Sequence, residues 1–152
     1  MQNKKPYLKP FFVLSLLFFG VGMIIFLDQL VKYKIRQIGG FYICNSGISF
    51  GLNLHPVLFW SFLSLFILST LFYLLYITQK GNLSTIQSLS FVLLIGGALS
   101  NGLDRAFFGC VIDFITILKP LFPLFNLADL FIFIGSFLLF VLVLLKKDSS
   151  SV

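Results

Sequence analysis

Residues 10–32 read PFFVLSLLFFGVGMIIFLDQLVK. No charged side chain occurs between Lys9 and Asp28, so this stretch is long and apolar enough to cross the hydrocarbon core of a lipid bilayer. A cleaved secretory signal would be shorter and would end on small residues, whereas this run continues directly into DQLVK. We therefore interpret residues 10–30 as a membrane span that the chain retains.

Three more apolar runs follow, at about residues 56–78, 86–103 and 126–145. Each has about 18–23 residues, the length that a helix rising 1.5 Å per residue needs to cross a bilayer. Helices are expected because lipid leaves the backbone amides no other hydrogen-bonding partner. With 59% hydrophobic and only 11% charged residues, the sequence predicts an all-α membrane protein, with one domain over residues 1–152 and four transmembrane helices.

The four predicted crossings put both ends of the chain on the same side of the membrane. The positive-inside rule only weakly favours a cytoplasmic location for both ends, because the basic residues divide six against five. The inner side would hold Lys4, Lys5, Lys9, Lys80, Lys146 and Lys147, and the outer side Lys32, Lys34, Arg36, Arg105 and Lys119.

Aspartate supplies all five acidic residues of the chain, and glutamate is absent. Only Asp148 lies in an evidently polar tail, and the other four border or interrupt apolar sequence, where a carboxylate is costly to desolvate. All four follow or precede predicted span ends that share one side of the membrane, which predicts an interfacial functional site there. They are Asp28, Asp104, Asp113 and Asp129.

Residues 41–44 are short and β-prone, and they lie between Gly39-Gly40 and the turn-forming sequence Asn45-Ser46-Gly47. This pattern predicts a small extramembrane β element on the same side as the four acids. An alternative is that residues 45–47 form only a turn and take no part in a site.

Metal and nucleic-acid binding are both disfavoured. Cys44 and Cys110 lack the spacing of metal ligands, and His55 has no histidine or cysteine partner in the sequence, so we expect neither a metal ion nor a cofactor. A disulfide between the two cysteines stays open, without support from the sequence. The net charge of +6 is spread over both ends and the loops, which suits anionic membrane lipids and excludes a nucleic-acid-binding face.

Asp113 and Asp129 flank the short segment between the third and fourth spans, so a turn there can bring their side chains together. Two neighbouring carboxylates cannot both ionise and therefore share a proton, so that one activates water while the other protonates the carbonyl or leaving group. The pair is thus a candidate for amide hydrolysis. The alternative is that Asn126 and Asp129 only cap the fourth helix.

Other polar residues have structural interpretations beside the functional one. Asp104 and Arg105 could form an interfacial ion pair, and Asp28 could pair with Lys32 at helical spacing. The small residues 96–98 (Gly-Gly-Ala) are typical of close helix packing in membranes.

Five short blocks resemble the motifs of the lipoprotein signal peptidase family (signal peptidase II), in the family order and across most of the chain. Any one block is weak, whereas the five together are highly specific. In this chain Ser100 stands where the family usually has glycine, and the segments 29–44 and 114–125 are short for the family. The blocks are DQLVK at 28–32, NSGISFG at 45–51, GGALSNGLDR at 96–105, VIDF at 111–114 and FNLAD at 125–129.

The resemblance implies four transmembrane helices with a β-cradle on the outer face of a bacterial plasma membrane, and both termini in the cytoplasm. It implies a metal-free aspartyl endopeptidase that cuts diacylglyceryl-modified prolipoproteins just before the lipidated cysteine and is sensitive to globomycin-type inhibitors. Asp113 and Asp129 would be its catalytic pair. Supporting residues would be Asp28, Lys32, Asn101, Asp104, Arg105, Asn126 and Ala128, and residues near the substrate Asn45, Gly47, Phe50 and Gly51.

Two rival functions remain. A small proton- or ion-conducting subunit would place acids at mid-span on several helices, whereas here they cluster at predicted span ends. A non-catalytic homologue that acts as a membrane assembly factor would bind a lipidated peptide without turning it over.

Overall fold

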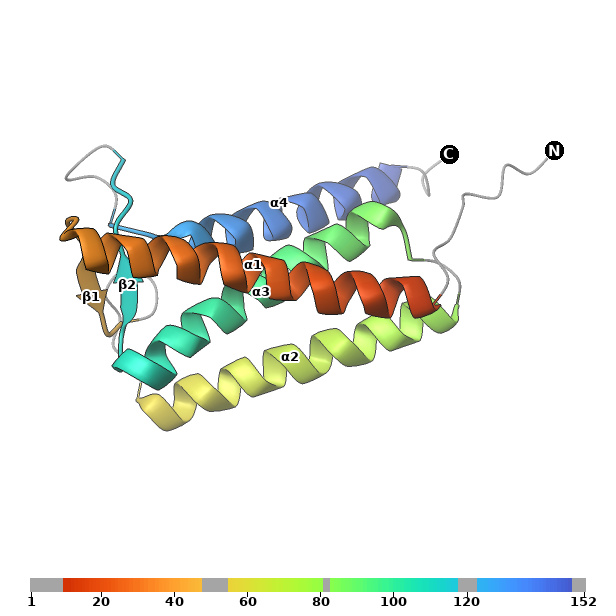
Figure 1. Cartoon of the computed structure of the whole chain (residues 1–152). Coiled ribbons are helices and arrows are strands. Elements are labelled where there is room, and N and C mark those ends of the chain that lie inside the picture. The colour runs from red at the N-terminus through yellow and green to blue at the C-terminus, as the bar shows by residue number, and fades with distance from the viewer. Residues whose placement is uncertain (1–9, 48–54, 81–82, 118–122, 149–152) are drawn as a thin grey trace.

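Four long helices and a two-stranded antiparallel sheet make up the described part of this protein in the computed structural model (Figure 1). The structure describes residues 10–47, 55–80, 83–117 and 123–148. All four helices are long and apolar enough to cross a membrane. This confirms the predicted fold, and the chain is a multi-pass membrane protein. The elements are α1 (Pro10–Ile38), β1 (Ile43–Asn45), α2 (Pro56–Gln79), α3 (Thr85–Phe108), β2 (Val111–Asp113) and α4 (Leu127–Asp148).

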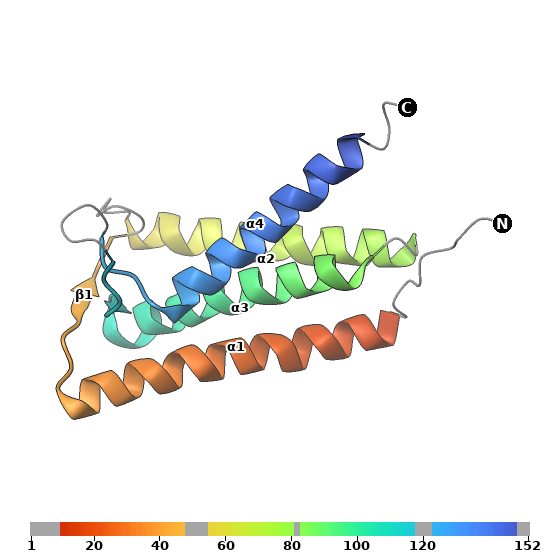
Figure 2. The same ribbon diagram turned by 90° about the horizontal axis from the view of Figure 1, so that it is seen from above.

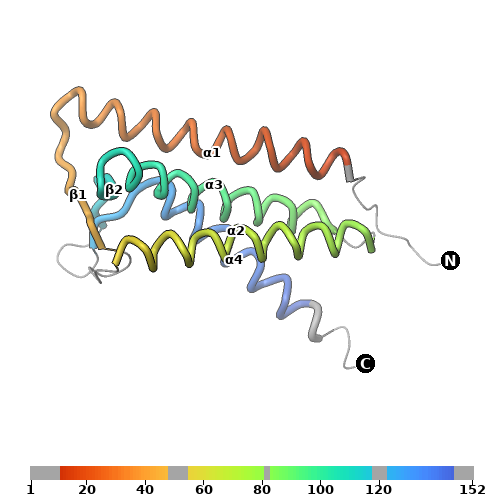
Figure 3. Tube along the Cα trace, turned by 90° about the horizontal axis from the view of Figure 1, so that it is seen from below, coloured from red at the N-terminus to blue at the C-terminus, as the bar shows by residue number. Residues whose placement is uncertain are grey.

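α3 is the central helix of the bundle. Its most apolar stretch is 61% buried, against 17% for α1 and 11% for α2 and for α4, whose remaining surface is free to face lipid. α3 packs mainly against α1 and α4 and touches α2 much less. Figures 2 and 3 show α4 diverging from the other helices toward its C-terminal end.

Small residues allow the helices around α3 to approach closely. A Cβ atom at Gly97 would lie 2.6 Å from the carbonyl oxygen of Ala128 in α4, and one at Gly96 would lie 2.7 Å from Cβ of Ile24 in α1. Without a hydrophobic driving force inside lipid, such backbone contact is a main source of helix association. The interpretation of residues 96–98 as a packing element is therefore confirmed.

The helices extend further at the sheet end than the sequence predicted. α1 continues to Ile38 instead of about residue 30, and α3 continues to Phe108 instead of about residue 103. Asp28 and Asp104 consequently lie inside helices and not beyond the helix ends. The helices do not stop at these charges because the charges are satisfied within the protein. α3 ends where Gly109 takes a left-handed conformation with φ of 72°.

The sheet joins the end of α1 to the end of α3. β1 pairs with β2 so that Ile43 faces Asp113 and Asn45 faces Val111. A disulfide connects Cys44 to Cys110, with Cα atoms 5.4 Å apart, although the sequence analysis found no support for one. The position of the cysteines in the sequence could have indicated the disulfide. Each directly precedes a motif, and both motifs were predicted on the same side of the membrane.

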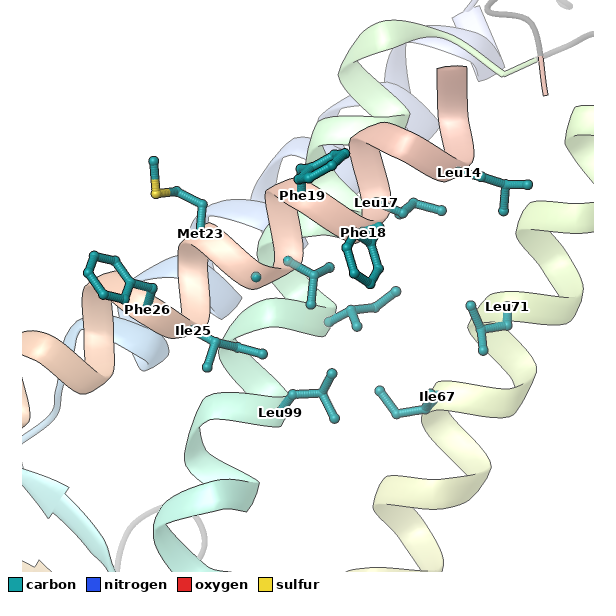
Figure 4. Close-up of a pocket in the computed structure, with 13 residues that line it drawn as sticks. Leu14, Leu17, Phe18, Phe19, Met23, Ile25, Phe26, Ile67, Leu71 and Leu99 are labelled. Atoms are coloured by element: carbon teal, nitrogen blue, oxygen red, sulfur yellow. The ribbon is translucent and has the colours of Figure 1, made fainter. Parts of the chain in front are cut away.

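An apolar groove of about 880 Å³ separates α2 from α1 over part of the bundle. Leu99 of α3 and Ile67 of α2 point toward each other across it (Figure 4). The groove explains why α2 contributes little to the packing of α1. The polar site described below therefore depends chiefly on α1, α3, α4 and the sheet.

We predict opposite effects of one substitution at two helical glycines. Gly97→Ala adds a methyl group where the α4 backbone must shift, so overpacking should lower stability by about 1–3 kcal/mol. Gly22→Ala is the matched control, because its added Cβ would meet no atom within 4 Å apart from its own stretch of helix, and alanine favours a helix by about 1 kcal/mol over glycine. Thermal unfolding in detergent should show a lower midpoint for Gly97→Ala alone, and equal midpoints for both variants would contradict the packing argument.

Candidate active site

Polar groups from α1, β1, α3, β2 and the start of α4 converge at the sheet end of the bundle, at the left in Figure 1. The sequence placed these residues on one side of the membrane, and the structure joins them into one hydrogen-bonded network. The members predicted from the sequence are Asp28, Lys32, Asn45, Asn101, Asp104, Arg105, Asp113, Asn126, Ala128 and Asp129.

A backbone bridge brings Asp113 to the start of α4. Ile115 and Phe125 exchange two backbone hydrogen bonds of 2.8 and 3.0 Å, so the chain after β2 folds back on itself. Asp113 and Asn126 lie just beyond the bridge on its two arms. The short segment between the third and fourth spans thus closes as the sequence predicted.

Asn126 is fully buried and bonds to both candidate catalytic acids. Its Nδ2 donates to Oδ1 of Asp113 at 2.7 Å, and its backbone N–H donates to Oδ2 of Asp129 at 3.1 Å. Its Oδ1 accepts from the backbone N–H of Asp129 at 2.9 Å. Asn126 and Asp129 therefore do cap α4, and the same asparagine also bonds to Asp113, so capping is not its sole contact.

Asn101 of α3 holds Asp129 from the other side. Its Nδ2 donates to Oδ1 of Asp129 at 2.7 Å. Its Oδ1 accepts from Asn126 Nδ2 at 3.1 Å and from Lys32 Nζ at 3.0 Å. Asn101 therefore links the acid pair to a buried ionic cluster beneath it.

The ionic cluster consists of Lys32 with Asp28 and Asp104, and none of the three has exposed surface. Nζ of Lys32 lies 2.6 Å from Oδ2 of Asp28 and 2.8 Å from Oδ2 of Asp104. With the bond to Asn101, all three ammonium protons have an acceptor. The predicted pairing of Asp28 with Lys32 at helical spacing is confirmed.

The alternative pairing of Asp104 with Arg105 is wrong. Adjacent residues of a helix do not face each other, and Asp104 instead accepts from the backbone N–H of Ile112 at 3.1 Å. Arg105 donates from Nη2 to the carbonyl oxygen of Gly47 at 2.7 Å, and its guanidinium lies 4.5 Å from the ring centre of Phe59 in α2.

The turn after β1 belongs to the site. Gly47 donates its backbone N–H to Oδ1 of Asn45 at 3.0 Å, which confirms the predicted turn. Nδ2 of Asn45 is therefore left to donate to Oδ2 of Asp113, at 2.8 Å. Two further residues expected near the substrate, Phe50 and Gly51, lie outside the residues that the structure describes.

Two members of the network, Gln29 and Ser100, were not predicted as site residues. Oγ of Ser100 donates to Oδ2 of Asp28 at 2.7 Å, and Nε2 of Gln29 donates to Oδ1 of Asp104 at 2.8 Å. Ser100 had been noted only as a departure from a glycine. Residues 97, 100, 101 and 104 are spaced to share one face of a helix, and this spacing could have identified Ser100 as a member of the site.

Burial raises the pKa of the Asp113 carboxyl above its usual range. The hydrogen bond from Asn45 opposes that rise, the negative charge of Asp129 adds to it, and the hydrogen bond from Asn126 and the charge of Lys32 oppose it. A carboxyl that holds its proton more tightly than an ordinary aspartate, beside a second carboxyl, is suited to acid–base catalysis.

The chain is similar in sequence and in fold to known proteins. The chain resembles the lipoprotein signal peptidases of Gloeothece citriformis (35% identical, covering 82% of this chain and 86% of the relative), Nostoc punctiforme (34%, 83% and 87%) and Syntrophomonas wolfei (41%, 68% and 66%). A bacterial membrane enzyme solved by the in meso method at 2.3 Å resolution has the same fold, with a TM-score of 0.76, 24% identity, and coverage of 91% of this chain and 92% of that one. The family model described as "Signal peptidase (SPase) II" matches residues 20–145, most of the chain's length. The chain therefore belongs to the signal peptidase II family.

Proposed function

We propose that this protein is an aspartyl endopeptidase that removes the signal peptide from diacylglyceryl-modified prolipoproteins, cutting just before the lipidated cysteine. One observation carries the aspartyl mechanism: Asp113 and Asp129 are both hydrogen-bonded to Asn126. Family membership supports the peptidase activity and the prolipoprotein substrate, since the similar proteins are lipoprotein signal peptidases.

The mechanism uses one proton shared by the two carboxyl groups. The ionised carboxylate takes a proton from water as the water oxygen attacks the scissile carbonyl carbon, and the protonated carboxyl donates to the carbonyl oxygen. Collapse of the tetrahedral intermediate then transfers a proton to the leaving amine. The protonation steps belong to the coupled pair Asp113 and Asp129 as a unit. Asn45, Asn101 and Asn126 hold the two carboxyl groups in place by donating to them.

The position of the pair suits a lipid-anchored substrate. Asp129 lies in the first turn of a membrane-crossing helix and Asp113 at the end of a strand outside the helices, which supports a site where the bilayer gives way to water. The diacylglyceryl chains of the substrate can remain in the bilayer, among membrane lipids, while its peptide bond reaches the acids and water enters from the aqueous side.

The disulfide supports an orientation with the site on the outer face of a bacterial plasma membrane and both termini in the cytoplasm. Disulfides persist outside the cytoplasm and are rare within it, where thiols are kept reduced. The Cys44–Cys110 bond is on the same end of the bundle as the two acids. It therefore favours the outer leaflet more strongly than the near-even division of lysines and arginines does.

Asp113→Asn and Asp129→Asn should each lower cleavage of a diacylglyceryl-modified prolipoprotein by at least about 10²–10⁴-fold, because each removes one member of the acid–base pair. The assay is gel-shift detection of the released signal peptide, with purified protein in detergent. Asp148→Asn is the matched control, since it makes the same substitution at the other end of α4 and should retain activity. Near-normal cleavage by either site variant would refute the catalytic pair.

The pH dependence of kcat/KM should reflect the raised pKa of Asp113. The limb of the profile that titrates Asp113 should lie above the pKa of about 3.9 of an ordinary aspartate. Asn45→Ala removes a hydrogen bond that opposes the rise, so the pKa of Asp113 should increase further and the limb that titrates Asp113 should move to higher pH. An unchanged profile in Asn45→Ala would show that this hydrogen bond does not act on the titrating group.

Inhibitor profiles give a separate test of the mechanism. We expect globomycin-type peptides to block cleavage and a chelator such as EDTA to leave it unchanged, because the proposed mechanism uses two carboxyl groups and no metal ion. The measurement is the initial cleavage rate with and without each compound. Loss of activity in EDTA, restored by a divalent cation, would overturn the metal-free mechanism.

A further inference from the structure

The disulfide joins the two strands next to the residues that contact the acid pair. Cys44 is the middle residue of β1 and lies opposite Ile112, and Cys110 directly precedes β2. Asn45, which donates to Asp113, is the residue after Cys44. The covalent bond is therefore only one residue from the contact between β1 and the candidate catalytic acid.

The noncovalent support of β1 is small. Each strand has three residues, and a two-stranded pair of this size is marginal in water by itself. The strands are also distant in sequence, since 66 positions separate the two cysteines, and α2 and α3 lie between them. Between α1 and β1 the chain turns at Gly39, whose φ is 76°. The direction of β1 is therefore set by its pairing in the sheet and not by the end of α1.

We propose that the Cys44–Cys110 disulfide is a positioning element of the active site, which holds β1 in the register that lets Asn45 donate to Asp113. The same register brings the carbonyl oxygen of Gly47 to Arg105. The inference rests on the proposed peptidase function. It adds Cys44 and Cys110 as positioning residues, which do not touch the reacting atoms.

Loss of the bond should alter the titration of Asp113 through Asn45. Burial raises the pKa of Asp113, and the Asn45 hydrogen bond opposes that rise. The charged groups around this carboxyl come from each neighbouring helix: Lys32 from α1, Arg105 from α3 and Asp129 from α4. Lys32 and Asp129 bond to α3, whereas Arg105 bonds to Gly47 just after β1. A displaced β1 therefore removes the Asn45 contribution and leaves the charges of Lys32 and Asp129 in place.

The test replaces both cysteines with serine and measures kcat, KM and the pH profile on a diacylglyceryl-modified prolipoprotein. The double variant should lose about tenfold in kcat/KM, the usual effect of losing one hydrogen bond to a charged group. The limb of its pH profile that titrates Asp113 should move to higher pH, as in Asn45→Ala. A disulfide with only a global structural role would change the melting temperature and leave the pH profile unmoved.

Reduction of the folded wild type gives the same test without a substitution. Dithiothreitol transfers two electrons and two protons to the disulfide, leaving thiols at Cys44 and Cys110 and becoming a cyclic disulfide itself. We expect the wild type to acquire the kinetics and pH profile of the double variant, while the double variant should not respond to the reagent. This arm keeps the proposal testable if the serine variant does not fold.

A variant that combines Asn45→Ala with both serine substitutions tests whether the disulfide affects Asp113 through Asn45. If the disulfide acts through Asn45, the combined variant should show the pH shift of Asn45→Ala alone, because the hydrogen bond can be lost only once. Fully additive shifts would overturn the proposal. So would a double serine variant, or a reduced wild type, with unchanged kinetics and pH profile.

The proposal can be separated from the peptidase function by titrating Asp113 directly. Carboxyl ¹³C NMR reads the pKa of Asp113 in the oxidised wild type and in the double serine variant without any turnover. An equal pKa in both overturns the positioning role. Failure of the oxidised wild type to cleave the substrate instead overturns the proposed function, whatever the titration gives.

Discussion

The buried ammonium of Lys32 is the interaction on which the site depends. Removing an ion from water costs several kcal/mol, so this lysine and its two carboxylates are tolerable only if every proton and lone pair is matched. The three acceptors of the ammonium protons come from two helices. Asp28 lies on α1 with Lys32, and Asp104 and Asn101 lie on α3. Each carboxylate also accepts a backbone N–H, from Ala128 at the start of α4 and from Ile112 in β2.

This cluster explains how a loose membrane bundle can hold a well-defined acid pair. Helices in lipid gain little from burying apolar surface against one another, so their relative positions must come from close contacts and polar bonds. Gly97 brings α3 against α4 until Ala128 can reach Asp28. Asn101 then fixes the position of Asp129 relative to the cluster, because its side-chain amide bonds to both Lys32 and Asp129. The candidate catalytic residues are positioned by groups with no chemical role of their own.

The apolar runs predicted the four helices correctly because length and hydropathy alone decide what can span a bilayer. The acid pair was predictable as well, since Asp113 and Asp129 flank a short connection. The ends of the helices were not. A sequence marks Asp28 as a charge beside an apolar run, and only the three-dimensional arrangement reveals that Lys32 and Ser100 let it remain inside a helix. The same limit explains the incorrect partner for Asp104, because the correct one is far away in sequence.

The covalent bond between the strands also bears on how the protein is made. Cys44 leaves the membrane after the first crossing, whereas Cys110 emerges only after the second and third helices have been inserted. The two sulfur atoms can therefore meet only when α2 and α3 form a completed helical hairpin across the bilayer. The disulfide can thus be present only in a chain whose first three helices have been inserted. Cys110, the second cysteine to emerge, is followed directly by the strand that carries Asp113.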